Sequence, residues 1–258
     1  MRRQRRSDSG RQWRWTLFLL WGVLVLAFPG EASAEDIVVA STSLAGAMAR
    51  AGGAKEVRVL TPDGLTHPPE YELKPSDLVK LEGATLVVYA GYEKMVTKLL
   101  ETSKNKNLLA LQIDTTPSPE NLITQVRKIS KALKTEKEGE VWEARFSERI
   151  TGLKKNLSSL SGKRAVVHFH TQPFSRWAGL SVVHVFKPGE LTPKAMADAI
   201  GRGPELVVDI LHMPMLKVVA ENARCKYIQV INFPGAGNTK TLEDVFEYNA
   251  GQLRNAFR

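Results

Sequence analysis

Five histidines are the side chains of this 258-residue chain best suited to bind a transition metal. They are His67, His168, His170, His184 and His212. A neutral imidazole nitrogen suits Zn²⁺ and similar divalent ions, which need three or four nitrogen, oxygen or sulfur ligands. Whether these imidazoles can meet depends on the strands and loops that carry them.

Short runs rich in β-branched residues alternate with helical stretches along the chain, and we interpret these runs as strands. The predicted strands are 37–40, 57–60, 86–89, 108–113, 165–169, 181–186, 206–210 and 227–231. Residues 119–160 lack a strand pattern. Within this stretch, apolar residues spaced three and four apart from Phe146 to Leu160 predict one long helix that ends before Gly162.

Nearly continuous apolar strands are typical of parallel sheets that are buried on both faces. Four strands, a long helix and four more strands predict an α/β fold with two lobes. Each lobe is expected to hold a roughly four-stranded, mostly parallel sheet flanked by helices. We place the lobes at residues 35–137 and 162–258 and the linking helix at 138–161.

Four of the histidines follow the carboxyl ends of predicted strands, where ligands bind in open parallel sheets. His67 lies in the loop after the second strand, His168 and His170 end the fifth, and His212 follows the seventh. His184 lies inside a strand and is expected to be structural. Because residues two apart in a strand share a face, the pattern leaves open whether His168 or His170 faces the cleft.

The first 34 residues have the order of a cleavable secretory signal. Six arginines precede an apolar run that ends at Phe28, and Ala32-Ser33-Ala34 is a small-residue cleavage site. Because this segment holds six Arg against Asp8 and Glu31, the mature chain keeps about +5 of the formal charge of +9. The signal predicts export to the periplasm.

The remaining composition argues against two other classes of function. The excess of basic residues is mild, and no aromatic residues interleave with the lysines as nucleic-acid stacking requires, so no nucleic-acid partner is expected. No G-x-S-x-G, P-loop or H-E-x-x-H motif is present, and the paired acids near residue 71 suggest no substrate. We therefore do not expect an enzyme.

Several stretches together make the chain resemble the solute-binding proteins of zinc and manganese ABC transporters, the cluster with a rigid helix between its lobes. These stretches are 37–53 (IVVASTSLAGAMARAGG), 64–77, 86–93 (LVVYAGYE), 168–180 and the closing helix around Tyr248-Asn249. The resemblance implies a periplasmic protein that binds Zn²⁺ or alternatively Mn²⁺. It also implies an ABC permease in the inner membrane as partner and no catalytic activity.

The chain departs from this family at the metal ligands. Pro69 stands where the family loop has its histidine, and His67 lies two residues earlier. Residues 114–118 (DTTPS) replace the stretch that carries the family's second histidine, and Asn232 takes the place of its final aspartate. By spacing, the third ligand maps onto His168, with His170 as a near rival.

These observations predict a metal site of His67, His168 and His212, completed by Asp209 or water, with His170 as a substitute. The favoured function is capture of a divalent transition metal, zinc first, by a monomer that delivers it to the permease. One alternative is a divergent paralogue that binds no metal and serves as an interaction partner in the envelope. Another is a binder of a metal chelate or small organic solute, with Trp142 and Trp177 as candidate cleft walls, although core packing is the preferred role for both.

Overall fold

The computed structural model describes residues 36–62, 71–72, 74–103 and 105–258. The predicted signal peptide, residues 1–34, and His67 lie outside the described residues. Residues 35–258 form one compact unit. Within the described part of this unit, no helix is long and apolar enough to cross a membrane.

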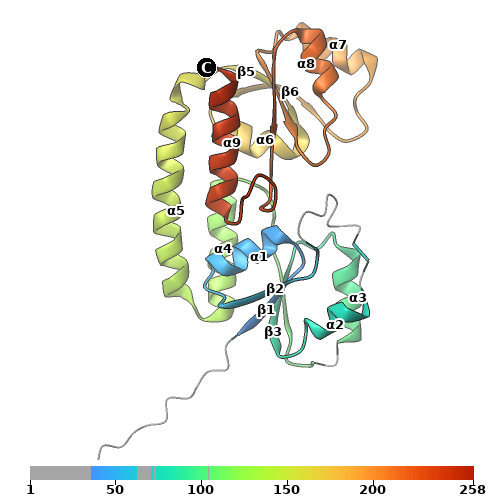
Figure 1. The fold of residues 1–258 in the computed structure, drawn as a ribbon, viewed down its shortest axis with the longest axis vertical. Helices are drawn as coiled ribbons and strands as arrows, with labels where there is room; N and C mark the ends of the chain where they lie inside the picture. Colours follow the sequence, from blue (N-terminus) through green and yellow to red (C-terminus); the bar gives the residue numbers. More distant parts are fainter. Residues whose placement is uncertain (1–35, 63–70, 73, 104) are drawn as a thin grey trace, which may run out of the picture. The chain divides into compact units, whose positions relative to one another are not determined.

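The first half of the unit contains a parallel four-stranded sheet in the order β2-β1-β3-β4. Its strands are β1 (Ile37–Ala40), β2 (Glu56–Val59), β3 (Ala84–Tyr89) and β4 (Leu109–Gln112). The helices of this half are α1 (Ser43–Ala51), α2 (Pro75–Val79) and α3 (Lys94–Thr102), seen in blue to green in Figure 1. Helix α1 begins directly after β1 because the Thr42 hydroxyl accepts the Ala45 amide as an N-cap.

The second half repeats this arrangement as a parallel sheet in the order β6-β5-β7-β8. Its strands are β5 (Arg164–His168), β6 (Ser181–Phe186), β7 (Leu206–Ile210) and β8 (Lys226–Val230). The connecting helices are α6 (Gln172–Trp177), α7 (Pro193–Gly201) and α8 (Lys217–Ala223). The predicted α/β class with two parallel four-stranded sheets is confirmed.

Burial differs from the prediction at the sheet edges, where strands such as β2, β4 and β6 are mostly half-buried or exposed. The inner strands β1, β3, β5 and β7 are almost wholly buried, as their apolar runs predicted. Strand β4 is an edge strand, and its Leu109 side chain is 59% exposed. An apolar run therefore predicted the strand correctly but not its position in the sheet, because both inner and edge strands can carry such runs.

Three helices connect the halves. They are α4 (Pro119–Leu133), α5 (Glu136–Asn156) and α9 (Leu242–Ala256), and α5 runs beside both α4 and α9 (Figure 1). The long helix predicted over 138–161 ends earlier, at Asn156, and a 3-10 turn, η2 (Ser158–Leu160), follows it. The left-handed residue Lys134 separates α4 from α5.

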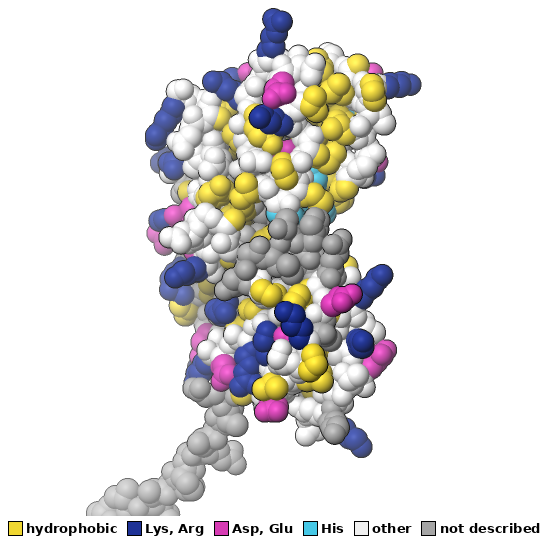
Figure 2. Space-filling view, turned by 45° about the vertical axis from the view of Figure 1, so that its right-hand side comes forward, with side chains coloured by type: hydrophobic (Ala, Val, Ile, Leu, Met, Phe, Trp, Pro, Cys, Tyr) yellow, Lys and Arg dark blue, Asp and Glu magenta, His cyan; other side chains and the backbone are white. Residues whose placement is uncertain are grey.

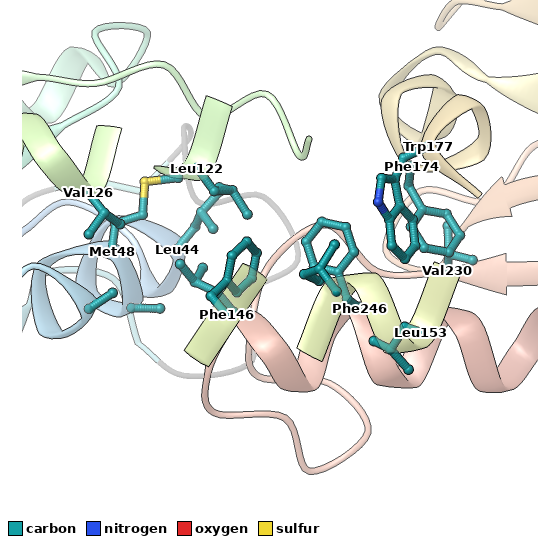
Figure 3. Packing of buried hydrophobic residues seen from close by; sticks show 14 of the residues in the cluster. Leu44, Met48, Leu122, Val126, Phe146, Leu153, Phe174, Trp177, Val230 and Phe246 are labelled. Atoms are coloured by element: carbon teal, nitrogen blue, oxygen red, sulfur yellow. The ribbon is translucent and has the colours of Figure 1, made fainter. Parts of the chain in front are cut away.

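One hydrophobic core extends through both halves (Figure 3). At its centre Phe146 of α5 stacks on Trp142, with ring centroids 4.6 Å apart, and meets Phe246 of α9 edge-on at 5.9 Å. Phe246 in turn contacts Trp177 at 5.0 Å. Both tryptophans are thus core residues, as preferred from the sequence, and the shared core opposes large movements of one sheet relative to the other.

Candidate metal-binding cleft

A cavity of about 430 Å³ opens where the loops after the strands of both sheets approach each other. The first half supplies Thr42, Tyr92 and Asp114 to its wall, and the second half supplies His170, His212 and Asn232, among other residues. In the space-filling view, the visible histidine side chains gather in one zone with hydrophobic side chains nearby (Figure 2). The prediction that the carboxyl ends of the strands would form the ligand cleft agrees with this cavity.

The chain turns immediately after β5, and this turn separates the roles of His168 and His170. Strand β5 ends at His168, and a 3-10 turn, η3 (Phe169–Thr171), follows. The alternation of side chains between the two faces of β5 therefore ends before His170. The expectation that both imidazoles lie on one face of the strand does not hold. His168 is fully buried, whereas His170 lines the cavity. Their ring centroids are 5.3 Å apart.

His168 is held in the neutral form by its surroundings. Burial, reinforced by the nearby His170, lowers the pKa of His168 to about 4, although Asp209 acts in the opposite direction. Its Nδ1 accepts the His170 backbone N–H at 3.2 Å. Its Nε2 has no hydrogen-bond partner among the described residues. Burial also lowers the pKa of His170, so both imidazoles are neutral near pH 7, as metal binding requires.

His212 follows β7 and lines the cavity, as its position after the seventh strand predicted. Its ring lies 5.0 Å from the Phe233 ring, which lines the same wall. His184, expected to be structural, lies in the edge strand β6, where its ring contacts Phe186 at 4.4 Å.

Asn232 lies just after β8 and is positioned by helix α9. The buried Asn249 side chain accepts the Ile231 N–H at 2.8 Å and donates to the Ile231 carbonyl at 2.7 Å. This pair of bonds orients the backbone that leads into Asn232. The Asn232 Oδ1 atom is buried and has no hydrogen-bond partner among the described residues. Two residues on, the Pro234 carbonyl accepts the Ser43 hydroxyl of α1 at 2.8 Å, which joins the two halves beside the cavity.

Asp209 does not present a carboxylate to the cavity. Its Oδ1 accepts the Ile210 N–H at 2.9 Å, and its Oδ2 accepts the N–H groups of Met215 and Leu216 and the Tyr227 hydroxyl at 2.7–2.9 Å. The side chain is fully buried. These four donors use the carboxylate to hold the loop after β7, and Asp209 is not among the described residues that line the cavity.

The first half contributes one acid that we did not predict as a site residue. Asp114 follows β4 through Ile113, lines the cavity and is exposed. One carboxylate oxygen, Oδ1, accepts the Thr116 N–H at 2.8 Å. Its place after the carboxyl end of a strand was the available signal, the same one that selected the histidines.

No group of three or more His, Cys, Asp or Glu side chains lies close enough to hold a metal within the ranges that the structure describes. His67, the ligand expected from the first half, lies outside those ranges. The described part of the cleft therefore brings together His170 and His212, with His168 directly behind His170.

Comparisons with known proteins identify the family and agree with the fold. The family model described as zinc-uptake complex component A periplasmic (ZnuA) matches residues 38–256. A search of curated proteins found no match.

Among solved structures, the Mn-bound periplasmic metal binding protein of Candidatus Liberibacter asiaticus superposes with a TM-score of 0.68 and 17% identity, covering 86% of this chain and all of that one. The Cd-bound form of that protein gives a TM-score of 0.67 at 17% identity, with the same coverage. The solute-binding protein FpvC of Pseudomonas aeruginosa, in complex with Mn²⁺, gives 0.65 at 16% identity, covering 86% of this chain and 97% of that one. At these identities the structural likeness establishes the fold, and the family model establishes the membership. The chain belongs to the ZnuA family of periplasmic metal-binding proteins, which are solute-binding proteins and not enzymes.

Proposed function

We propose that the protein captures a divalent transition metal, with zinc preferred, in the cleft between its two sheets and delivers it to an ABC permease in the inner membrane. The N-terminal segment exports the chain, and the mature protein works as a monomer in the periplasm. The long helix α5 and the shared core favour a rigid carrier, in which small loop movements release the metal.

The observation that carries this proposal is a set of nitrogen and oxygen acceptors at the ends of three neighbouring strands. His168 ends β5, His212 follows β7 and Asn232 follows β8, and His170 lies on the turn after β5. One acceptor atom, Asn232 Oδ1, is buried without a hydrogen-bond partner among the described residues. Such an atom costs free energy unless a cation or donor occupies the space before it. The proton of the neutral His168 ring is on Nε2, because Nδ1 accepts the His170 N–H.

The donor types favour zinc over manganese. Neutral imidazoles suit Zn²⁺, whereas Mn²⁺ prefers carboxylate, carbonyl and water oxygens. An asparagine in place of the family's final aspartate also removes a charged oxygen ligand from the set. We propose His170 and His212 as ligands and His67 as the contribution of the first half. His168 supports His170 through the hydrogen bond at its Nδ1, and it becomes a third ligand only when the proton leaves its Nε2.

The test is a titration of the mature protein, residues 35–258, with zinc and with manganese, followed by metal analysis after dialysis. We expect about one equivalent of zinc, held more tightly than manganese. His212→Ala and His170→Ala should each weaken zinc binding at least about tenfold, because each removes an imidazole ligand. His184→Ala is the matched control, since His184 lies in β6 and contacts Phe186.

Two results would contradict the proposal. Binding that weakens equally in His184→Ala and His212→Ala would place the metal outside the cleft. A folded protein that retains no zinc, manganese, iron or copper would end the metal-capture proposal, and the divergent paralogue that serves as an envelope interaction partner would then be the function to test.

A further inference from the structure

The described wall of the cleft has the chemistry of a small-molecule pocket more than that of a closed ion site. Its volume of about 430 Å³ falls in the range of pockets that bind small organic ligands. An ion coordinated by four protein donors at about 2.0–2.3 Å leaves no comparable space around itself. The cavity therefore has room for an occupant larger than a bare ion.

Aromatic rings line this cavity on both sides. Tyr92, between β3 and α3, is 53% exposed, and Phe169, on the turn after β5, is 43% exposed. Phe233 lies on the same wall, with its ring 5.0 Å from that of His212. Phe169 meets the His170 ring edge-on, with centroids 5.3 Å apart. A phenyl ring thus accompanies each cleft-lining imidazole, and organic groups gain more from such rings than a hydrated ion does.

The charged residues of the cavity wall also limit which complexes fit. The residues that line it in the described part of the chain include one acid, Asp114, and neither Lys nor Arg. An anionic complex would meet the Asp114 carboxylate without a compensating cation. A complex without net charge fits this wall better, as does a ring or chain that can lie against Tyr92 and Phe169.

These three observations lead us to infer that the cargo is a divalent metal carried by a small organic chelator as a complex without net charge. The inference rests on the proposed metal-binding function and names its substrate class. His170 and His212 take metal positions that the chelator leaves open, while the chelator contacts Tyr92, Phe169 and Phe233. A divalent metal with two amino-acid ligands has this composition, because two carboxylates balance the charge of the ion.

The experiment is equilibrium dialysis of the mature protein with zinc alone, with zinc and two equivalents of labelled L-histidine, with L-histidine alone, and with zinc citrate as the anionic contrast. We expect zinc and histidine to be retained together, with at least one histidine per zinc and affinity at least about tenfold above that for zinc alone. Histidine alone and zinc citrate should not be retained.

Tyr92→Ala should reduce retention of the zinc–histidine complex at least about fivefold and leave binding of zinc alone unchanged, because it removes a ring of the first half that faces the chelator. Tyr92 is 53% exposed, so the variant should fold. Val141→Ala is the control, since Val141 is a 59% exposed apolar residue of α5 outside the cavity wall.

The outcomes separate this inference from the proposed function. Zinc alone held as tightly as zinc with histidine, and no histidine retained beside the zinc, would overturn the inference and leave the proposed metal capture standing. Equal retention of zinc citrate, or retention of histidine without zinc, would also overturn it. Retention of neither zinc nor its complexes would contradict the inference and the proposed function together.

Discussion

The contact between Asn249 and the backbone of Ile231 gives the sharpest test of how the fold positions the cleft. Asn249 is buried on α9 and makes two hydrogen bonds, at 2.8 and 2.7 Å, to the residue before Asn232. Asn249→Leu keeps a similar volume but leaves the buried N–H and C=O of Ile231 without these partners. Each unsatisfied group costs about 1–3 kcal/mol, so we expect a loss of about 3–4 kcal/mol in the free energy of unfolding.

Urea unfolding and thermal unfolding of the metal-free mature protein measure this loss. For a chain of this size, 1 kcal/mol corresponds to about 2–4 °C, so the melting temperature should fall by about 6–16 °C. Asn249→Asp should also be strongly destabilised near pH 7, since its carboxylate still accepts the Ile231 N–H but turns a charged acceptor toward the Ile231 carbonyl in a buried site. Zinc affinity of folded Asn249→Leu should also fall, because Asn232 loses its positioned backbone. A loss below about 1 kcal/mol in Asn249→Leu would refute the reasoning.

Three further predictions follow from buried groups. The free energy of unfolding of the metal-free protein should fall by up to about 3 kcal/mol as the pH falls from 6.5 to 4. In this window the unfolded chain takes up a proton on His168, whereas the folded chain, with a His168 pKa of about 4, does not. His168→Asn should flatten the plot of unfolding free energy against pH measured with urea, and an unchanged slope would contradict the assignment. Phe246→Ala should cost about 3–5 kcal/mol with a single unfolding transition, since its ring contacts Phe146 and Trp177, and separate transitions for the two halves would contradict a shared core. Asp209→Asn should lower the melting temperature but change zinc affinity less than about threefold, because the Asp209 carboxylate accepts hydrogen bonds from protein donors. A loss of zinc affinity as large as that of His212→Ala would instead identify Asp209 as a zinc ligand.

Much of the fold could be predicted from the pattern of apolar residues. Strands 37–40, 181–186 and 206–210 match β1, β6 and β7 at both ends, and the other predicted strands differ from the structure by one or two residues. The signal was strong because inner parallel strands need apolar residues on both faces. The end of the long helix was less certain, because the apolar spacing continues from Leu153 through Leu157 to Leu160 while the backbone changes to a 3-10 turn.

The candidate site was predictable by position but not by orientation. The positions of His170 and His212 after strand ends were enough to bring both to the cavity wall. The turn after His168 could not be predicted, because the apolar Phe169 extended the strand pattern by one residue beyond the end of β5. The bonding of Asp209 was not predictable, because an acid at a strand end looks the same in sequence whether it faces a ligand or the amides of its own loop.

The most direct test of the central claim is the position of zinc in crystals of the mature protein, located by anomalous diffraction at the zinc edge. We predict one strong site at the carboxyl ends of β5 and β7, with the nitrogens of His170 and His212 within about 2.0–2.1 Å of the metal. A zinc site elsewhere on the protein, or an empty cleft in crystals of protein that retains zinc in solution, would contradict the account.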